Sequence, residues 1–278
     1  MLYSCKPLFE RIKAEVVGKI DSLPFEGDAP RVAIIQCGED EPSSRYIRNK
    51  LKDFEEVGIL ADVIRYPASC DIGDVCIKMM DIDYSGKYCG IIVQRPVLVS
   101  DVSPRYAAQW VADYMPAEMD IDGVVPDSGF IPPSVRGLDI LLKEWGVDPA
   151  GKSAVVIGRG DVGRPVARYL LDKDATVTVT HSKTPRSDLY AALKTADIVV
   201  GAAGLKSPLY PDLHSDAVVI DYGIRPGPGG KLHGDIADAE GSYCKYKTAV
   251  PGGMGLMVRA GLLLNIVDAM ERWANAKK

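Results

Sequence analysis

The stretch that decides the fold runs from Ser153 to Ser182 and reads SAVVIGRGDVGRPVARYLLDKDATVTVTHS. An apolar run, Ala154–Ile157, leads into a Gly-x-Gly-x-x-Gly pattern at Gly158–Gly163, and a helical stretch and a second apolar run at Thr176–Thr180 follow. In a strand–helix–strand unit of about 30 residues, such glycines allow a tight turn and bring the helix N-terminus close to a pyrophosphate. The stretch therefore predicts a dinucleotide site, and the alternative is a glycine-rich turn that binds nothing.

The residues after the second strand distinguish between two cofactors. An NAD enzyme usually carries Asp or Glu there, which accepts from the ribose hydroxyls, whereas this chain has His181-Ser182-Lys183-Thr184. No carboxylate repels a 2′-phosphate, while a hydroxyl and a cation can hold one, so we predict NADP in preference to NAD. A solvated surface role is the alternative for Lys183. The predicted cofactor-binding residues are Gly158, Arg159, Gly160, Gly163, Arg164, Ser182 and Lys183.

Strand-like and helical segments alternate along the rest of the chain. Apolar runs at Arg31–Cys37, Leu60–Tyr66 and Gly90–Gln94 are separated by helical stretches at Ser43–Val57 and Asp71–Asp81. Strands joined through helices pair in parallel, which predicts an α/β class. The first of these helices is expected to begin with a serine cap at its N-terminus and to end at a glycine.

The chain of 278 residues is long enough for two domains. A turn-rich stretch at 126–133 marks the expected crossing, between helices predicted at Asp101–Trp110 and Val135–Trp145. A long apolar helix is predicted at Gly255–Trp273. We expect one domain at 1–136, joined by the C-terminal helix 256–278, and a second at 137–255. The second is expected to be a Rossmann-type, doubly wound parallel sheet.

Composition makes several classes of protein improbable. A net charge of −5 lacks the basic excess of a nucleic-acid binder. No apolar run reaches the roughly 18 residues of a membrane span, and the N-terminus lacks a secretory signal, so we expect a cytoplasmic protein with no membrane partner. The six cysteines form no Cys-x-x-Cys pair, so we expect free thiols and no metal site.

Four polar residues before the crossing are candidates for catalysis. Tyr46 and Lys50 are four residues apart on one face of a predicted helix, and a lysine in a cleft can handle protons. A surface pair is the alternative. Gln94 ends an apolar strand, at the edge of a parallel sheet where ligands gather. Asp120 and Asp122 alternate without a partnering histidine, so a substrate-orienting Asp122 is a stronger interpretation than a metal site.

These motifs, taken together and in order, resemble those of a known family. Gly38–Lys50 (GEDEPSSRYIRNK) looks like the Tyr-x-x-x-Lys signature of methylenetetrahydrofolate dehydrogenase/cyclohydrolase. Gly90–Leu98 (GIIVQRPVL) is similar to the family's motif around its glutamine, and Asp120-Ile121-Asp122-Gly123 resembles its Asp-Val-Asp-Gly. Further matches follow in order at Gly158–Pro165, His181–Thr184, Asp221–Ile224 and Pro251–Gly255. The resemblance thus covers nearly the whole chain.

The resemblance implies two α/β domains around a cleft, the first for tetrahydrofolate derivatives and the second for NADP, in a homodimer. It implies oxidation of 5,10-methylenetetrahydrofolate to the methenyl form and hydrolysis of that form to 10-formyltetrahydrofolate, in one-carbon metabolism and purine biosynthesis. By the same resemblance, Tyr46 stacks on the folate ring, Lys50 handles protons, Gln94 orients Lys50, and Asp122 holds the pterin. It also adds Ile224 to the cofactor residues and, to the substrate residues, Pro96, Val97, Gly252 and Gly253.

The chain departs from the family pattern at several places. The glycine turn is one residue shorter, Pro132-Pro133-Ser134-Val135 replaces Pro-Cys-Thr-Pro, and Met119 stands where the family has lysine. The four catalytic candidates are retained, so both activities are expected. The alternatives are a dehydrogenase of a pterin one-carbon carrier without hydrolase activity and a non-catalytic dinucleotide-binding protein.

Overall fold

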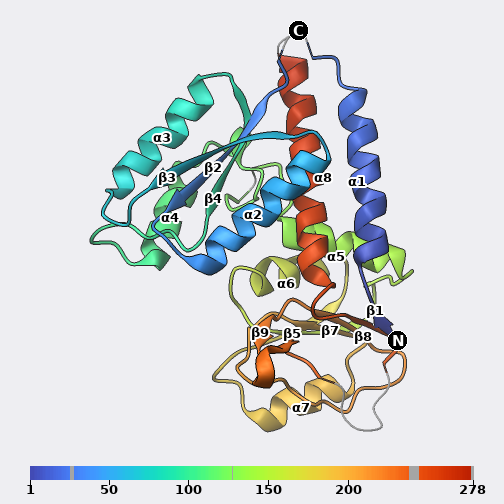
Figure 1. Ribbon diagram of the computed structural model, residues 1–278. Coiled ribbons are helices and arrows are strands. Elements are labelled where there is room, and N and C mark those ends of the chain that lie inside the picture. Colours follow the sequence, from blue (N-terminus) through green and yellow to red (C-terminus); the bar gives the residue numbers. More distant parts are fainter. Residues whose placement is uncertain (26–27, 127, 238–243, 277–278) are drawn as a thin grey trace. The chain divides into compact units, whose positions relative to one another are not determined.

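A computed structural model describes residues 1–25, 28–126, 128–237 and 244–276 (Figure 1). The chain forms two compact units. Unit 1 comprises Met1–Glu10 and Ser134–Gly261, and unit 2 comprises Arg11–Pro133 and Leu262–Lys278. Each unit has its own parallel sheet, which confirms the predicted α/β class. Within the turn-rich stretch at 126–133, Asp127 lies outside the described residues.

Unit 1 is built on a six-stranded sheet in the order β1-β11-β8-β7-β5-β6, with every neighbouring pair parallel. The strands are β1 (Leu2–Tyr3), β5 (Ser153–Ile157), β6 (Thr176–Thr180), β7 (Ile198–Gly201), β8 (Val218–Asp221) and β11 (Tyr246–Thr248). A short antiparallel hairpin, β9 (Arg225–Pro226) and β10 (Leu232–His233), with a 3-10 turn at Pro228–Gly230, lies between β8 and β11.

The helices of this unit cover both faces of the sheet. Helix α6 (Gly163–Asp172) contacts β5 and β6, and α7 (Arg186–Lys194) lies on the opposite face (Figure 1). Leu193 of α7 packs in one apolar cluster with Val155 and Val199. Because the chain leaves β5 toward β6 on one side and continues to β7 on the other, the topological switch point lies between β5 and β7. Ligands of open parallel sheets bind at the carboxyl ends of such strands.

Unit 2 has a three-stranded sheet in the order β3-β2-β4. Its strands are β2 (Arg31–Cys37), β3 (Leu60–Tyr66) and β4 (Tyr88–Gln94). The helices are α2 (Glu41–Glu56), α3 (Ile72–Tyr84), α4 (Pro104–Tyr114) and a 3-10 turn at Ala117–Met119. Helices α1 (Lys6–Asp21) and α8 (Met254–Ala276) are divided between the two units. Helix α5 (Pro133–Glu144) begins at the boundary between unit 2, which includes Pro133, and unit 1, which resumes at Ser134.

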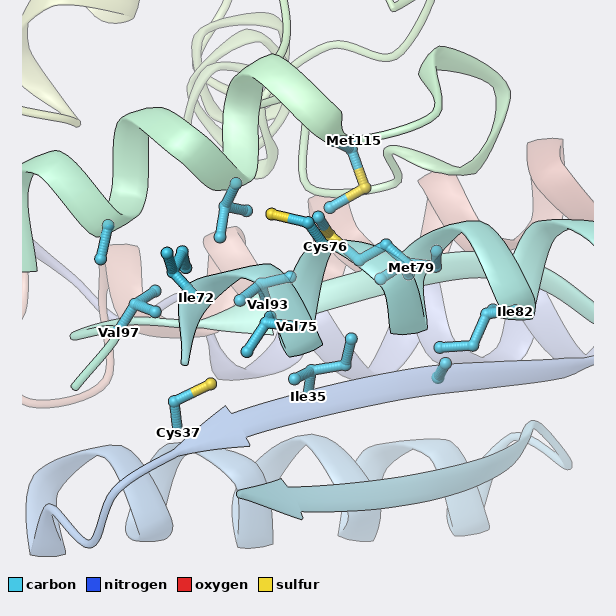
Figure 2. Packing of buried hydrophobic residues seen from close by; sticks show 14 of the residues in the cluster. Ile35, Cys37, Ile72, Val75, Cys76, Met79, Ile82, Val93, Val97 and Met115 are labelled. Atoms are coloured by element: carbon cyan, nitrogen blue, oxygen red, sulfur yellow. The ribbon is translucent and has the colours of Figure 1, made fainter. Parts of the chain in front are cut away.

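The two faces of the unit 2 sheet differ in what they contact. Figure 2 shows Ile35 and Val93 in an apolar cluster with Val75 and Met79 of α3, and Val111 of α4 belongs to the same cluster. Because side chains of a strand alternate between faces, the neighbours of Ile35 and Val93, which are Gln36 and Gln94, point to the other face. That face meets α2, which forms hydrogen bonds to both glutamines.

Several predicted elements begin elsewhere than expected. Helix α2 is capped by Asp40, whose carboxylate accepts from the backbone N–H of Ser43, so the prediction of a serine cap is wrong. Pro42 lies in the first turn, where its missing N–H costs nothing. Helix α4 begins at Pro104 rather than Asp101, because Asp101 has φ +56° and cannot continue a right-handed helix. None of the described helices is long and apolar enough to cross a membrane.

Candidate functional site

The three glycines of the Gly158–Gly163 turn in unit 1 have different surroundings. Gly158 has φ +109°, and a Cβ there would lie 2.7 Å from the carbonyl carbon of Ala202. A Cβ on Gly163 would lie 2.8 Å from the carbonyl carbon of Gly158. Gly160, in contrast, has no heavy atom within 4 Å of its Cβ position. The outer glycines are therefore required by packing, whereas Gly160 leaves open space that a pyrophosphate can approach.

The first turn of α6 supplies the electrostatic part of this half-site. Its N-cap residue, Val162, makes no side-chain hydrogen bond to the helix. In the first turn of α6, the N–H of Arg164 donates to the carbonyl of Gly160 at 3.1 Å and Pro165 has no N–H, so Gly163 is the residue whose N–H has no acceptor among the described residues. The helix dipole favours negative charge at this N–H. Arg159 and Arg164 are both exposed, and the guanidinium Nε of Arg164 donates to the carbonyl of Arg159 at 2.9 Å. These features fit a dinucleotide phosphate.

The turn after β6 presents the residues predicted to select NADP. The backbone N–H of His181 donates to Thr184 Oγ1 at 3.0 Å, and the N–H of Lys183 donates to His181 Nδ1 at 3.1 Å. These bonds order the turn and leave Ser182 and Lys183 exposed. The turn lies beside the glycine loop, because the N–H of Gly158 donates to the carbonyl of Thr180 at 2.9 Å.

The remaining candidates of unit 1 follow two other strands at the same sheet edge. Ile224 comes three residues after β8, and its side chain is 46% exposed. Gly252, with φ +96°, and Gly253 lie between β11 and α8. A Cβ on Gly253 would lie 2.9 Å from Cβ of Thr248, so this glycine is required by packing.

Lys50 and Gln94 are in direct contact in unit 2. Lys50 Nζ donates to Gln94 Oε1 at 3.2 Å, across from α2 to the carboxyl end of β4. Gln94 Nε2 donates to the carbonyl of Arg95 at 3.0 Å, which fixes the orientation of its amide. Both side chains are partly buried. The structure thus places an amine with one fixed partner at a sheet edge where ligands bind.

Tyr46 lies one helical turn before Lys50. Its side chain is 49% exposed, whereas the adjacent Ile47 is buried. An exposed ring beside a fixed amine can stack on a planar ligand. Tyr46 makes no hydrogen bond to Lys50 or Gln94 in the described part of the chain.

The two carboxylates of Asp120-Ile121-Asp122-Gly123 have separate roles. Asp120 is fully buried and accepts from the backbone N–H groups of Val124 and Val125 at 3.1 and 2.7 Å. These two hydrogen bonds organise the turn, and burial raises the pKa of the Asp120 carboxyl. Asp122 remains partly exposed. Because Asp120 bridges Ile91 in parallel, Asp122 lies farther toward the carboxyl end of β4, on the side of Gln94.

Pro96 and Val97 follow Gln94 directly. Pro96, after a cis peptide bond, is exposed, whereas Val97 is 1% exposed and belongs to the apolar cluster under the sheet. Val97 as a whole residue therefore belongs to the core of unit 2 and offers almost no surface to a substrate.

One polar residue at the carboxyl edge of the unit 2 sheet was not predicted from the sequence. Gln36 is the penultimate residue of β2, is buried, and donates through Nε2 to Ser44 Oγ of α2 at 3.0 Å. It pairs in register with Gln94. A polar residue near the end of an apolar strand was the available signal, the same one that selected Gln94.

Comparisons with known proteins agree with these two half-sites. The model for the catalytic domain of tetrahydrofolate dehydrogenase/cyclohydrolase matches residues 3–122, and that for its NAD(P)-binding domain matches residues 132–274. The bifunctional protein FolD of Moorella thermoacetica is 38% identical over 280 residues, which cover 96% of this chain and 97% of the relative.

Solved structures show the same likeness over the full length. The bifunctional FolD enzyme of Campylobacter jejuni superposes with a TM-score of 0.88 at 30% identity, covering 98% of this chain and 99% of that one. The FolD enzyme of Trypanosoma brucei, solved with NADP and an inhibitor, has a TM-score of 0.86 at 29% identity, covering 98% and 97%.

Proposed function

Because the chain belongs to the tetrahydrofolate dehydrogenase/cyclohydrolase family, we propose that it oxidises 5,10-methylenetetrahydrofolate with NADP and hydrolyses the methenyl product. The oxidation converts methylenetetrahydrofolate and NADP⁺ into the methenyl cation and NADPH. The hydrolysis adds water to that cation and releases 10-formyltetrahydrofolate and a proton. The observation that carries the proposal is the hydrogen bond of 3.2 Å between Lys50 and Gln94.

Lys50 is the group that handles the proton of the hydrolysis. Water attacks the methenyl carbon, and the attacking water must lose protons as the ring opens to the formyl group. Lys50 is the amine of this sheet edge, and its bond to Gln94 holds Nζ in one place. Gln94 is a positioning residue, since its own amide is anchored on the carbonyl of Arg95.

Tyr46 and Asp122 are proposed to hold the pterin. The exposed ring of Tyr46 offers a stacking surface one turn from Lys50. The partly exposed carboxylate of Asp122 can accept from the N–H groups along the polar edge of the pterin. Because Asp120 is occupied by backbone N–H groups, Asp122 is the carboxylate of this motif that is left for the substrate.

Unit 1 is proposed to bind NADP, which supplies the hydride acceptor. Gly160 and the first turn of α6 receive the pyrophosphate, and Ser182 and Lys183 the 2′-phosphate. The exposed side chain of Ile224 can cover a flat apolar ring of the cofactor. Calorimetry should show tighter binding of NADP than of NAD, and Ser182→Asp should reduce the difference by placing a carboxylate against the phosphate.

The assignment is tested with Lys50→Met and the control Lys52→Met. Lys52 is an exposed lysine of the same helix. Following the absorbance of NADPH and of the methenyl product, we expect the unmodified chain to catalyse both steps. Lys50→Met should abolish hydrolysis and leave NADP binding unchanged, while Lys52→Met should retain both activities. Full hydrolysis by Lys50→Met would remove this residue from its role, and the absence of both steps in the unmodified chain would refute the function.

The domain boundaries, oligomeric state and location predicted from the sequence complete the proposal. We propose that 1–136 with 256–278 acts on folate and that 137–255 binds NADP, in a cytoplasmic homodimer. The edge strand β6, with Val179 40% exposed, offers a surface that a second copy can cover. Sedimentation velocity at several concentrations measures the oligomeric state, and fractionation of cells measures the location.

A further inference from the structure

A buried carboxylate holds the loop that follows β7. Asp235 is fully buried. Its Oδ2 accepts from the backbone N–H groups of Ala203 and Gly204 at 2.7 and 3.0 Å, and its Oδ1 accepts from that of Leu205 at 2.6 Å. Hydrogen bonds to an ionised acceptor are about twice as strong as neutral ones. Three successive donors on one carboxylate therefore fix the backbone of 203–205.

A second carboxylate fixes Asp235 in turn. Asp221, at the end of β8, accepts from the backbone N–H groups of Asp235 and Ile236 at 3.0 and 2.9 Å and from that of Gly223 at 2.8 Å. Burial raises the pKa of Asp221 to about 6, and these N–H groups oppose the shift. A Cβ on Gly223 would lie 2.6 Å from the N atom of Asp235. The two carboxylates are thus enclosed, and they connect β8 to the loop after β7.

The loop held by Asp235 adjoins the glycine turn. The N–H of Ala202 donates to the carbonyl of Ile157 at 2.8 Å, and the carbonyl of Ala202 lies where a Cβ on Gly158 would be. This is the switch point between β5 and β7, where a ligand of the sheet binds. Two groups of backbone N–H donors therefore lie at this edge. In α6, the N–H of Gly163 has no acceptor among the described residues, whereas the N–H groups of 203–205 are already occupied by Asp235.

We propose that Asp235 is a positioning residue for dinucleotide binding: it holds the 203–205 loop in its cofactor-ready form and occupies amides that would otherwise compete for the pyrophosphate. The inference rests on the proposed function of unit 1 as an NADP site. It predicts that the loop is ordered before the cofactor binds, so that little ordering entropy is lost on binding. Asp235 itself does not contact the reacting atoms.

The test compares Asp235→Asn with Asp216→Asn, an exposed carboxylate of the same unit. The amide of asparagine places a donor against at least one of the three N–H groups. Loss of charged hydrogen bonds of this kind predicts a Kd and KM for NADP raised about 10- to 100-fold. The kcat of oxidation at saturating NADP, and kcat and KM of hydrolysis, should stay within about twofold. Asp216→Asn should behave as the unmodified chain.

Two outcomes with a folded variant would overturn the inference. One is an NADP affinity unchanged by Asp235→Asn. The other is a parallel loss of hydrolysis and oxidation, which would indicate a purely structural role. Because affinity is measured by calorimetry, the test is distinct from that of the proposed function: a chain without oxidation activity would refute the function, while the change in nucleotide affinity would still decide the role of Asp235.

Two further measurements serve if Asp235→Asn fails to fold. Gly204 has φ +60°, and a Cβ there would approach only the end of the Arg225 side chain, at 3.3 Å. Gly204→Ala should therefore disturb the loop mildly and raise the Kd for NADP with hydrolysis unchanged. In the unmodified chain without cofactor, amide hydrogen exchange at 203–205 should be slow. Exchange there as fast as in exposed turns would overturn the inference.

Discussion

Replacing Gly158 by alanine separates backbone geometry from cofactor binding. Gly158 has φ +109°, a conformation that residues with a Cβ rarely adopt, at a cost of about 1–3 kcal/mol. The added methyl would also lie 2.7 Å from the carbonyl carbon of Ala202 and 3.0 Å from the N atom of Ala203. Both neighbours are backbone atoms, so relief requires a shift of the 202–203 segment, at a further cost of about 1–3 kcal/mol.

The two costs together predict that Gly158→Ala lowers the free energy of unfolding by about 2–6 kcal/mol. This is a large share of the roughly 5–15 kcal/mol of an ordinary domain. Gly160→Ala is the matched control. No heavy atom lies within 4 Å of its Cβ position and its φ lies outside the left-handed region, so its stability should stay within about 0.5 kcal/mol of the unmodified chain.

Urea unfolding followed by circular dichroism and by tryptophan fluorescence measures the stabilities. Trp145, buried in unit 1 and stacked on Tyr246 with ring centroids 5.0 Å apart, reports on the unit that contains both glycines. Calorimetry should show weaker NADP binding by both variants. In Gly158→Ala the glycine turn is displaced by the clash with the 202–203 backbone, and in Gly160→Ala the added methyl fills the space of the pyrophosphate. Equal stabilities of the two variants would refute the packing argument, and full NADP affinity of Gly160→Ala would refute the phosphate position.

Three further changes test other parts of the structure. Hydrogen bonds from Arg31, Lys87 and Tyr88 lower the pKa of Asp62 to about 2. The ionised Asp62 therefore stabilises the folded state fully at pH values above the unfolded pKa of about 3.8, and this stabilisation is lost as the pH falls through about 2. Because Asp62 is partly exposed, Asp62→Asn should lower the free energy of unfolding, measured in urea at pH 7, by only about 1 kcal/mol. An equal loss at pH 2 would contradict this pH dependence. Gln36→Leu should lower the rate of methenyl hydrolysis with NADP affinity unchanged, because its bond to α2 is lost; an unchanged rate would exclude a positioning role. Asn265 donates to two backbone carbonyls at 2.8 Å, so Asn265→Leu should lower the free energy of unfolding by about 2–4 kcal/mol, and a loss below 1 kcal/mol would show that those carbonyls find other partners.

The sequence pattern was sufficient to predict those features whose signal is confined to a few neighbouring residues. The strands at Arg31–Cys37, Leu60–Tyr66 and Thr176–Thr180 have the predicted bounds, because apolar runs between turns are typical of buried parallel strands. The positions of Lys50 and Gln94 were also predictable, the first from helical spacing and the second from the end of a strand. Their direct contact required the three-dimensional structure.

Helix α1 also has a local signal in the sequence. Helix α1 is not among the predicted elements, although Leu8, Ile12 and Val16 recur every four residues and are all buried. This is the spacing of an amphipathic helix. Met119, which replaces a lysine of the family pattern, is 6% exposed and lies in the apolar cluster of unit 2. Its environment explains why an apolar side chain is stable at that position.

The sequence by itself determined the α/β class, the dinucleotide turn at Gly158–Gly163 and the family, because these depend on short-range periodicity and on motifs in a fixed order. Only the tertiary structure decided which polar groups meet. It pairs β1 with β11, some 245 residues away, and it assigns Asp120 to the backbone, leaving Asp122 exposed. It also directs Asp235 to amides 30 residues earlier. Such partners are selected by burial and hydrogen-bond satisfaction across the fold, which no local window contains.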